Sequence, residues 1–89
     1  MKAMQVKFDK EKGTIDIIND GIKENWIDVC ENFDNDVHRI RNVEGHSPYN
    51  ALYACYDEDN KPSYYLVEED RQLDKVRHKV FLKKLGRTD

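Results

Sequence analysis

The sequence predicts an α+β fold: a small, mostly antiparallel sheet with helices packed on it, in the order β-β-α-β-β-β-α. Three observations predict it. Apolar and polar residues alternate in several short segments, apolar residues recur at helical spacing in two longer ones, and turn formers separate the segments. With 89 residues, 38% of them hydrophobic, the chain has enough apolar side chains for one core. We therefore expect a single compact domain over residues 1–89.

The first two segments predict a β-hairpin. Residues 4–8 and 14–18 alternate apolar and polar, and the residues between them end in Gly13, which suits a turn. The side chains expected to share one layer are Met4, Val6, Phe8, Ile15 and Ile17.

A helix is expected next, ending near Asn35. Either Asn19 or Asp20 is suited to cap its first turn. Five apolar side chains recur at the spacing of one helical face: Ile22, Trp26, Val29, Cys30 and Phe33.

Three further strands are expected over residues 37–43, 50–56 and 63–68, with turn formers between them. Alternation along the first of these strands places four side chains on one side: Val37, Arg39, Arg41 and Val43. In the other two strands both faces are apolar or aromatic. Either helices cover both faces, or one face exposes a patch rich in tyrosine.

Helical spacing returns in the last part of the chain. The expected helix begins at Asp70, ends before Gly86, and is strongly basic. Four basic residues follow one line along it at steps of four: Arg71, Lys75, Lys79 and Lys83. This line is suited to bind phosphates, or to pair with acids of the same or a second copy of the chain.

The charges are sorted along the sequence. Residues 20–70 hold 13 Asp and Glu against 4 Lys and Arg, whereas residues 71–89 hold 7 Lys and Arg against 2 Asp and Glu. The whole chain has a formal charge of −3, which disfavours a dedicated nucleic-acid-binding protein because such domains are usually basic. Segregated charges of this kind favour a charged macromolecular partner. They are also compatible with a homo-oligomer in which the basic segment of one copy meets the acidic segment of another.

Two acidic segments are the candidate partner-binding residues. Acids three or four residues apart on a helix have Cβ atoms roughly 5–6 Å apart, which is near the spacing of phosphates in nucleic acid. The alternative is that these acids are only the solvated side of a helix and a solvated turn. The first segment holds Glu24, Asp28, Glu31, Asp34 and Asp36, and the second holds Asp57, Glu58 and Asp59.

Three tyrosines are candidate anchors for the same partner. Tyr53, Tyr64 and Tyr65 lie on the two strands of the last expected hairpin. A desolvated aromatic side chain is the kind of residue that turns electrostatic steering into affinity. Burial of some of them in the core is the alternative.

No catalytic residue, cofactor or metal site is expected. Cys30 and Cys55 form no spacing motif and are expected to be reduced core cysteines, and the three histidines form no paired metal motif. No apolar segment is long enough for a signal peptide or a membrane span. We expect a cytoplasmic protein that has no membrane partner.

Residues 37–41, followed by a strand hairpin, resemble the strand–turn–strand core of small ribonuclease toxins. The resemblance implies RNA binding or cleavage that uses Arg39, Arg41 and the basic C-terminal helix. Such toxins are typically strongly basic, whereas this chain is acidic. The resemblance therefore supplies only the alternative function.

The leading hypothesis is a small acidic, non-enzymatic binding protein. It docks on a positively charged, nucleic-acid-binding surface of another protein and so acts as a nucleic-acid mimic. An inhibitor or regulator of this kind includes a phage-encoded defence blocker, an antitoxin or an immunity protein. Nucleic acid itself is the less favoured partner.

Overall fold

The computed structural model describes residues 1–46 and 48–69. The final helix expected from Asp70 onward lies outside the described residues, so that prediction stays open. Six strands, one short α-helix and a 3-10 turn follow each other along the described part. Their bounds are β1 (Lys2–Asp9), β2 (Thr14–Ile17), η1 (Asn19–Gly21), β3 (Lys23–Asn25), α1 (Trp26–Asn32), β4 (Val37–Asn42), β5 (Tyr49–Tyr56) and β6 (Pro62–Glu68).

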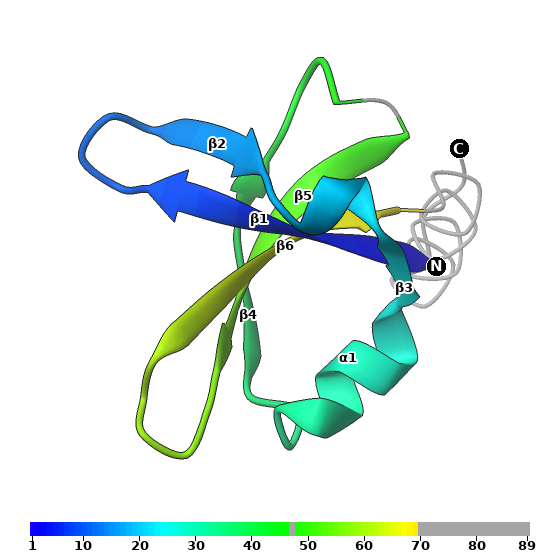
Figure 1. Ribbon diagram of the computed structural model, residues 1–89, viewed down its shortest axis with the longest axis vertical. Helices are drawn as coiled ribbons and strands as arrows, with labels where there is room; N and C mark the ends of the chain where they lie inside the picture. Colours follow the sequence, from blue (N-terminus) through cyan, green and yellow to red (C-terminus); the bar gives the residue numbers. More distant parts are fainter. Residues whose placement is uncertain (47, 70–89) are drawn as a thin grey trace, which may run out of the picture.

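The strands form one antiparallel sheet in the order β2-β1-β6-β5-β4, and β3 pairs with the first part of β1 (Figure 1). The β1–β2 and β5–β6 hairpins project from the sheet in different directions, and α1 follows directly on β3 (Figure 1). The α+β prediction therefore holds in its coarse form. The element order differs from the prediction because a short strand, β3, precedes the first helix.

The predicted first hairpin is confirmed. β1 and β2 are antiparallel neighbours, with Val6 opposite Ile17, so these two side chains lie on the same face as expected. The turn closes where the N–H of Gly13 donates to the carbonyl oxygen of Asp9 at 2.7 Å. Gly13 has a φ of 70°, which a glycine adopts without strain.

The first helix is much shorter than the sequence predicts. The apolar spacing predicts a helix from about Asp20 to Asn35, whereas residues 23–25 instead pair with β1. The side chain of Asn25, and not that of Asp20, caps α1 by accepting hydrogen bonds from two backbone N–H groups, at 3.0 and 3.3 Å. Ile22 is consequently 62% exposed and does not belong to the buried stripe. Pairing with a neighbouring strand has overridden the local helical spacing.

A β-bulge in β4 overturns the predicted alternation of that strand. Arg39 lies opposite Tyr53, but Arg41 lies opposite Leu52, because the register shifts between the two arginines. The extra residue is Ile40, which is 40% exposed. A bulge moves every later side chain of its strand to the other face. Arg39 and Arg41 therefore lie on opposite faces of the sheet.

One face of the sheet is covered by α1, and we call it the helix face. Trp26 and Val29 of α1 are buried against this face. Trp26 packs on Tyr53 with ring centroids 4.9 Å apart. The buried cluster on this face consists of Ala3, Trp26, Val29, Cys55, Tyr65 and Val67.

The opposite face is the inner side of a curled sheet, and we call it the concave face. Its buried side chains are enclosed by the sheet itself. The two edge strands β2 and β4 are four strand spacings apart, about 19 Å in a flat sheet. Yet the Nη2 group of Arg41 in β4 donates to the carbonyl oxygen of Gly13 beside β2, at 3.0 Å. The sheet must curl to bring them together, and the curl encloses a second buried cluster: Met4, Val6, Val43, Tyr49, Leu52 and Leu66. Both faces of the β5–β6 hairpin are thus covered, and within residues 1–46 and 48–69 a helix covers only one of them.

Candidate acidic docking site

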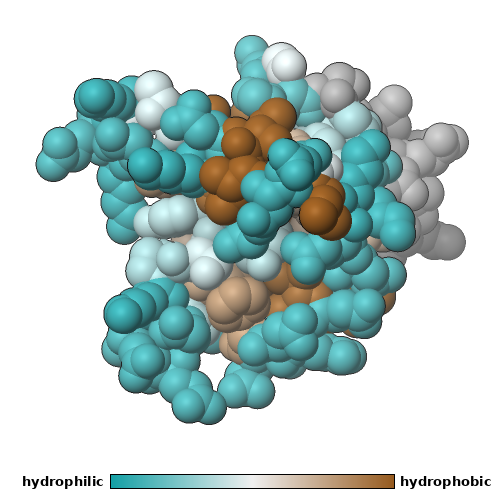
Figure 2. Space-filling model, in the orientation of Figure 1, coloured by the Kyte–Doolittle hydropathy of each residue, from teal (hydrophilic) through white to brown (hydrophobic). Residues whose placement is uncertain are grey.

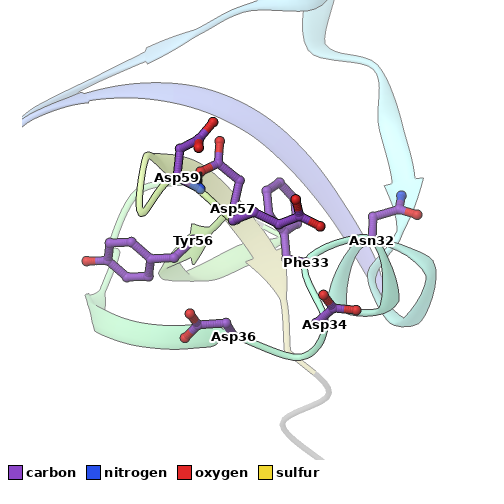
Figure 3. Close-up of a pocket in the computed structure, with 8 residues that line it drawn as sticks. Asn32, Phe33, Asp34, Asp36, Tyr56, Asp57 and Asp59 are labelled. Carbon is purple, nitrogen blue, oxygen red and sulfur yellow. Dashed lines mark hydrogen bonds between the residues drawn. The ribbon is translucent and has the colours of Figure 1, made fainter.

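An open hollow of about 480 Å³ lies where the end of α1 meets the β5–β6 turn. Figure 3 shows Asp34 and Asp36 coming from the connection between α1 and β4, and Asp57 and Asp59 from the β5–β6 turn. We call this hollow the acidic pocket. Its lining residues are Asn32, Phe33, Asp34, Asp36, Tyr56, Asp57, Glu58 and Asp59. Five acids that the sequence places in two separate segments therefore share one site.

The backbone after α1 turns Asp34 and Asp36 toward this site. Asp34 and Asn35 have φ values of 51° and 61°, a left-handed conformation that Asp and Asn tolerate better than most residues. The N–H of Asn35 donates back to the carbonyl oxygen of Cys30 at 2.8 Å. The N–H of Tyr56 then donates to the carbonyl oxygen of Asp36 at 3.0 Å, which joins this connection to the end of β5.

Within the β5–β6 turn, the three acids have different roles. Oδ1 of Asp57 accepts hydrogen bonds from the N–H groups of Asp59 and Lys61, both at 2.9 Å. Asp57 therefore stabilises the turn itself. The side chains of Glu58 and Asp59 are exposed and make no hydrogen bond or ion pair with any described residue.

Little positive charge compensates the pocket from within the described residues. Among them, Asp36 is the only pocket acid in contact with a basic side chain, Nε2 of His38 at 2.5 Å, and this contact is an ion pair only when the imidazole is protonated. The rings of His38 and Tyr56 also pack in a T-shaped arrangement, with their centroids 5.7 Å apart. The remaining acids add fields of the same sign, which attracts positively charged groups from solution. The described residues contain no group of three or more His, Cys, Asp or Glu side chains placed to hold a metal ion.

The other predicted acids do not form one helical row. Glu24 lies on β3, opposite Ala3, whereas Asp28 and Glu31 lie exposed on α1. The prediction of a continuous row on one helix is therefore wrong, because β3 replaces the first turns of that helix. What the structure gathers is the end of the first acidic segment with the whole of the second.

The three predicted tyrosines do not meet at one surface. Tyr65 is only 6% exposed, and burial, together with the charge of Glu24, raises its pKa to about 12. Tyr53 is half-buried on the helix face, and Tyr64 is half-buried on the concave face, 5.3 Å from the ring of Phe8. The aromatic residues that do line the acidic pocket are Phe33 and Tyr56. A signal for Tyr56 was present, since it ends its strand directly before three acids.

The cysteines lie in or against the core, as expected. Cys55 is fully buried, and Cys30 packs against the same cluster. Burial, reinforced by the neighbouring Cys30 and Asp36, raises the pKa of Cys55 to about 12. A thiol in that state is a poor nucleophile at neutral pH, because the reactive form is the thiolate.

Hydrophilic and apolar surface are separated in the view of Figure 2. Hydrophilic residues dominate the end that carries the β5–β6 turn, and apolar residues gather over β2 and η1. Two of the exposed apolar side chains are Ile17 and Ile22. None of the helices in the described part has the length and apolar character needed to cross a bilayer.

Comparison of the chain with protein-family models, with curated proteins and with solved structures finds no match in any of the three. Functional inference therefore depends on the geometry and charge of the chain itself.

Proposed function

We propose that this protein is a small, non-enzymatic binding protein that docks through the acidic pocket on a positively charged surface of another protein. That surface is one that binds nucleic acid, so the protein acts as an inhibitor or regulator by occupying it. A phage-encoded defence blocker, an antitoxin or an immunity protein acts in this way.

The convergence of the pocket acids carries the proposal. Two segments more than twenty residues apart contribute five carboxylates to one hollow, and only Asp36 contacts a basic side chain, that of His38, among the described residues. Such a concentration of one sign of charge steers a positive partner and raises its association rate. Phe33 and Tyr56 add aromatic surface beside the carboxylates, which suits contact with arginine side chains.

The geometry does not favour the alternative function of RNA binding or cleavage. That alternative needs Arg39 and Arg41 on a shared surface, whereas the bulge separates them. Arg39 is also paired with Glu69, at 3.0 Å. The basic C-terminal segment on which the alternative also relies lies outside the described residues.

A capture experiment with two matched variants tests the proposal. The pocket variant carries Asp34→Asn, Glu58→Gln and Asp59→Asn, which removes three pocket charges and keeps Asp57 for the turn. The control variant carries Glu11→Gln, Asp16→Asn and Asp20→Asn, which removes three exposed charges elsewhere. Tagged wild-type protein and both variants are incubated with extract of the native host or its target cell, and retained proteins are identified by mass spectrometry.

We expect a protein with a basic, nucleic-acid-binding surface to be retained by the wild type and the control variant but not by the pocket variant. Retention of the same proteins by all three, or retention of partners without a basic surface, contradicts the proposal.

A further inference from the structure

A second hollow, of about 370 Å³, lies between the two edges of the curled sheet. β2 and β4 end the sheet, so each has one side without a neighbouring strand in the described part. We call the hollow between them the seam pocket. Its lining residues are Gly13, Ile15, Arg41, Asn42, Val43, Glu44 and His46. None of them lines the acidic pocket, so a ligand of the seam pocket is independent of the proposed function.

The bulge in β4 places Arg41 at this pocket. Regular alternation puts Arg41 on the same face as Arg39, but the register shift moves it to the concave face. The shift leaves Ile40 without a partner on β5, and its side chain is 40% exposed. Bulges are frequent at sheet edges and beside functional sites, where they redirect a side chain.

Arg41 is held in place by neutral groups. Its Nη2 donates to the carbonyl oxygen of Gly13 at 3.0 Å, and its guanidinium carbon lies 5.4 Å from the centroid of the Phe8 ring. It makes no ion pair with any described residue, whereas Arg39 in the same strand pairs with Glu69 at 3.0 Å. A guanidinium has five N–H donors, so Arg41 is oriented while most of its donors and its whole charge stay available.

The composition of the pocket selects the chemical class of ligand. A guanidinium presents two parallel N–H groups that match the two oxygens of a carboxylate. A phosphate dianion usually needs several cations or a nest of backbone N–H groups. This pocket holds one arginine and one histidine, and the negative charge of Glu44 would repel a dianion. Ile15 and Val43 supply apolar surface for the carbon atoms beside the carboxylate.

We propose that the seam pocket is a carboxylate-binding site in which Arg41 is the principal ligand-binding residue. A free small carboxylate and a glutamate side chain of a peptide present the same group. The two sources differ in that a peptide also gains backbone hydrogen bonds from the free edges of β2 and β4.

An NMR titration of the full-length protein tests this site and distinguishes the sources. The probes are succinate, a blocked peptide of alternating valine and threonine with one central glutamate, and the same peptide with glutamine instead. We expect saturable amide shifts at Gly13, Ile15 and Val43 with succinate or the glutamate peptide, at a dissociation constant of about 1 mM or tighter. The glutamine peptide should not bind. Tighter binding of the glutamate peptide than of succinate identifies a peptide as the source, and the reverse order identifies a free carboxylate.

Variants of the two arginines provide the matched control. Arg41→Gln should weaken binding at least tenfold and Arg41→Lys several-fold, because lysine keeps the charge and loses the fork, whereas Arg39→Gln should change it less than twofold. The amide spectrum of each variant reports whether it is folded, and Arg41→Lys keeps the test decisive if Arg41→Gln does not fold. Three results overturn the proposal: no saturable shifts with either carboxylate probe, binding by the Arg41 variants that equals wild-type binding, or shifts confined to surface lysines away from the seam pocket.

Discussion

The two faces of the sheet are covered by different means, and each leads to a different pocket. The helix face is closed by α1, whose end continues into the acidic pocket. The concave face is closed by the curl of the sheet, which leaves a seam between β2 and β4. On the helix face Arg39 is neutralised by Glu69, while on the concave face Arg41 has no ion-pair partner among the described residues. The bulge in β4, more than the composition of the strand, thus decides which arginine remains available to bind a ligand.

Truncation of Trp26 should have the largest effect, because this residue fastens α1 to the helix face. Trp26→Ala removes a buried side chain that contacts both Tyr53 and Tyr65, and we expect a loss of about 3–5 kcal/mol in the free energy of unfolding. Ile27→Ala on the same helix should cost less than about 0.5 kcal/mol, since Ile27 is 64% exposed. Chemical denaturation measures both. Equal costs for the two variants show that α1 is not held by its buried side.

Alkaline pH should lower the free energy of unfolding through two groups on the helix face. Cys55 and Tyr65, both on this face, have pKa values raised by burial to about 12, from ordinary values of 9.0 and 10.0. Above those ordinary values the unfolded chain loses protons that the folded state retains, so stability falls as the pH rises. The slope should approach about 1.4 kcal/mol per pH unit for each group until the pH reaches the raised pKa.

Denaturation curves between pH 8 and pH 11 measure this fall. The double variant Cys55→Ala and Tyr65→Phe should be less stable at neutral pH but should lose less stability over that interval. An equal fall in the wild type and the double variant assigns the alkaline sensitivity to other groups.

Asp57 should differ from its neighbours in the acidic pocket. Asp57→Ala removes the acceptor of two turn hydrogen bonds, and we expect a cost of about 1–2 kcal/mol. Asp57→Asn keeps an acceptor oxygen at this position, so it should cost only a fraction of the loss expected for Asp57→Ala. Glu58→Ala should be neutral or slightly stabilising, because it reduces repulsion between like charges. Thermal denaturation at low salt ranks the three variants, and a large cost at Glu58 contradicts this assignment of roles.

A small cost is expected for breaking the ion pair on the helix face. Arg39 is largely exposed, so Arg39→Gln should cost about 0.5 kcal/mol or less, and less still at high salt. The Glu69→Gln variant should cost about the same, and the double variant should cost no more than either single variant if the pair is the only contribution. A cost well above 1 kcal/mol in high salt shows that Arg39 packs in a way that its charge does not explain.

Regular alternation and turn chemistry made much of the sheet predictable. The hairpin with Val6 opposite Ile17 follows from the period-two pattern and from Gly13 in the turn. The last two strands are also found where their aromatic and other apolar residues indicate. These features depend on local sequence, and local sequence is what periodicity reports.

The errors occur where a long-range contact competes with a local pattern. Ile22 has the right spacing for the helix, but pairing of residues 23–25 with β1 takes precedence. The bulge at Ile40 has no sequence signal such as a glycine, so the face of Arg41 was not predictable. The acidic character of the candidate site was visible in the sequence. That Asp34 and Asp36 meet Asp57 and its neighbours was not, because it depends on the left-handed turn after α1.

The central claim is that the carboxylates of the acidic pocket attract and seat a basic partner. The most direct test measures the association rate constant of the captured partner with wild-type protein and both triple variants over a series of salt concentrations. We expect the pocket variant to associate about tenfold more slowly at low salt, with a clearly weaker salt dependence, while the control variant stays within about twofold of the wild type. Equal slowing by the pocket variant and the control variant would show that net charge alone, and not this pocket, governs the encounter.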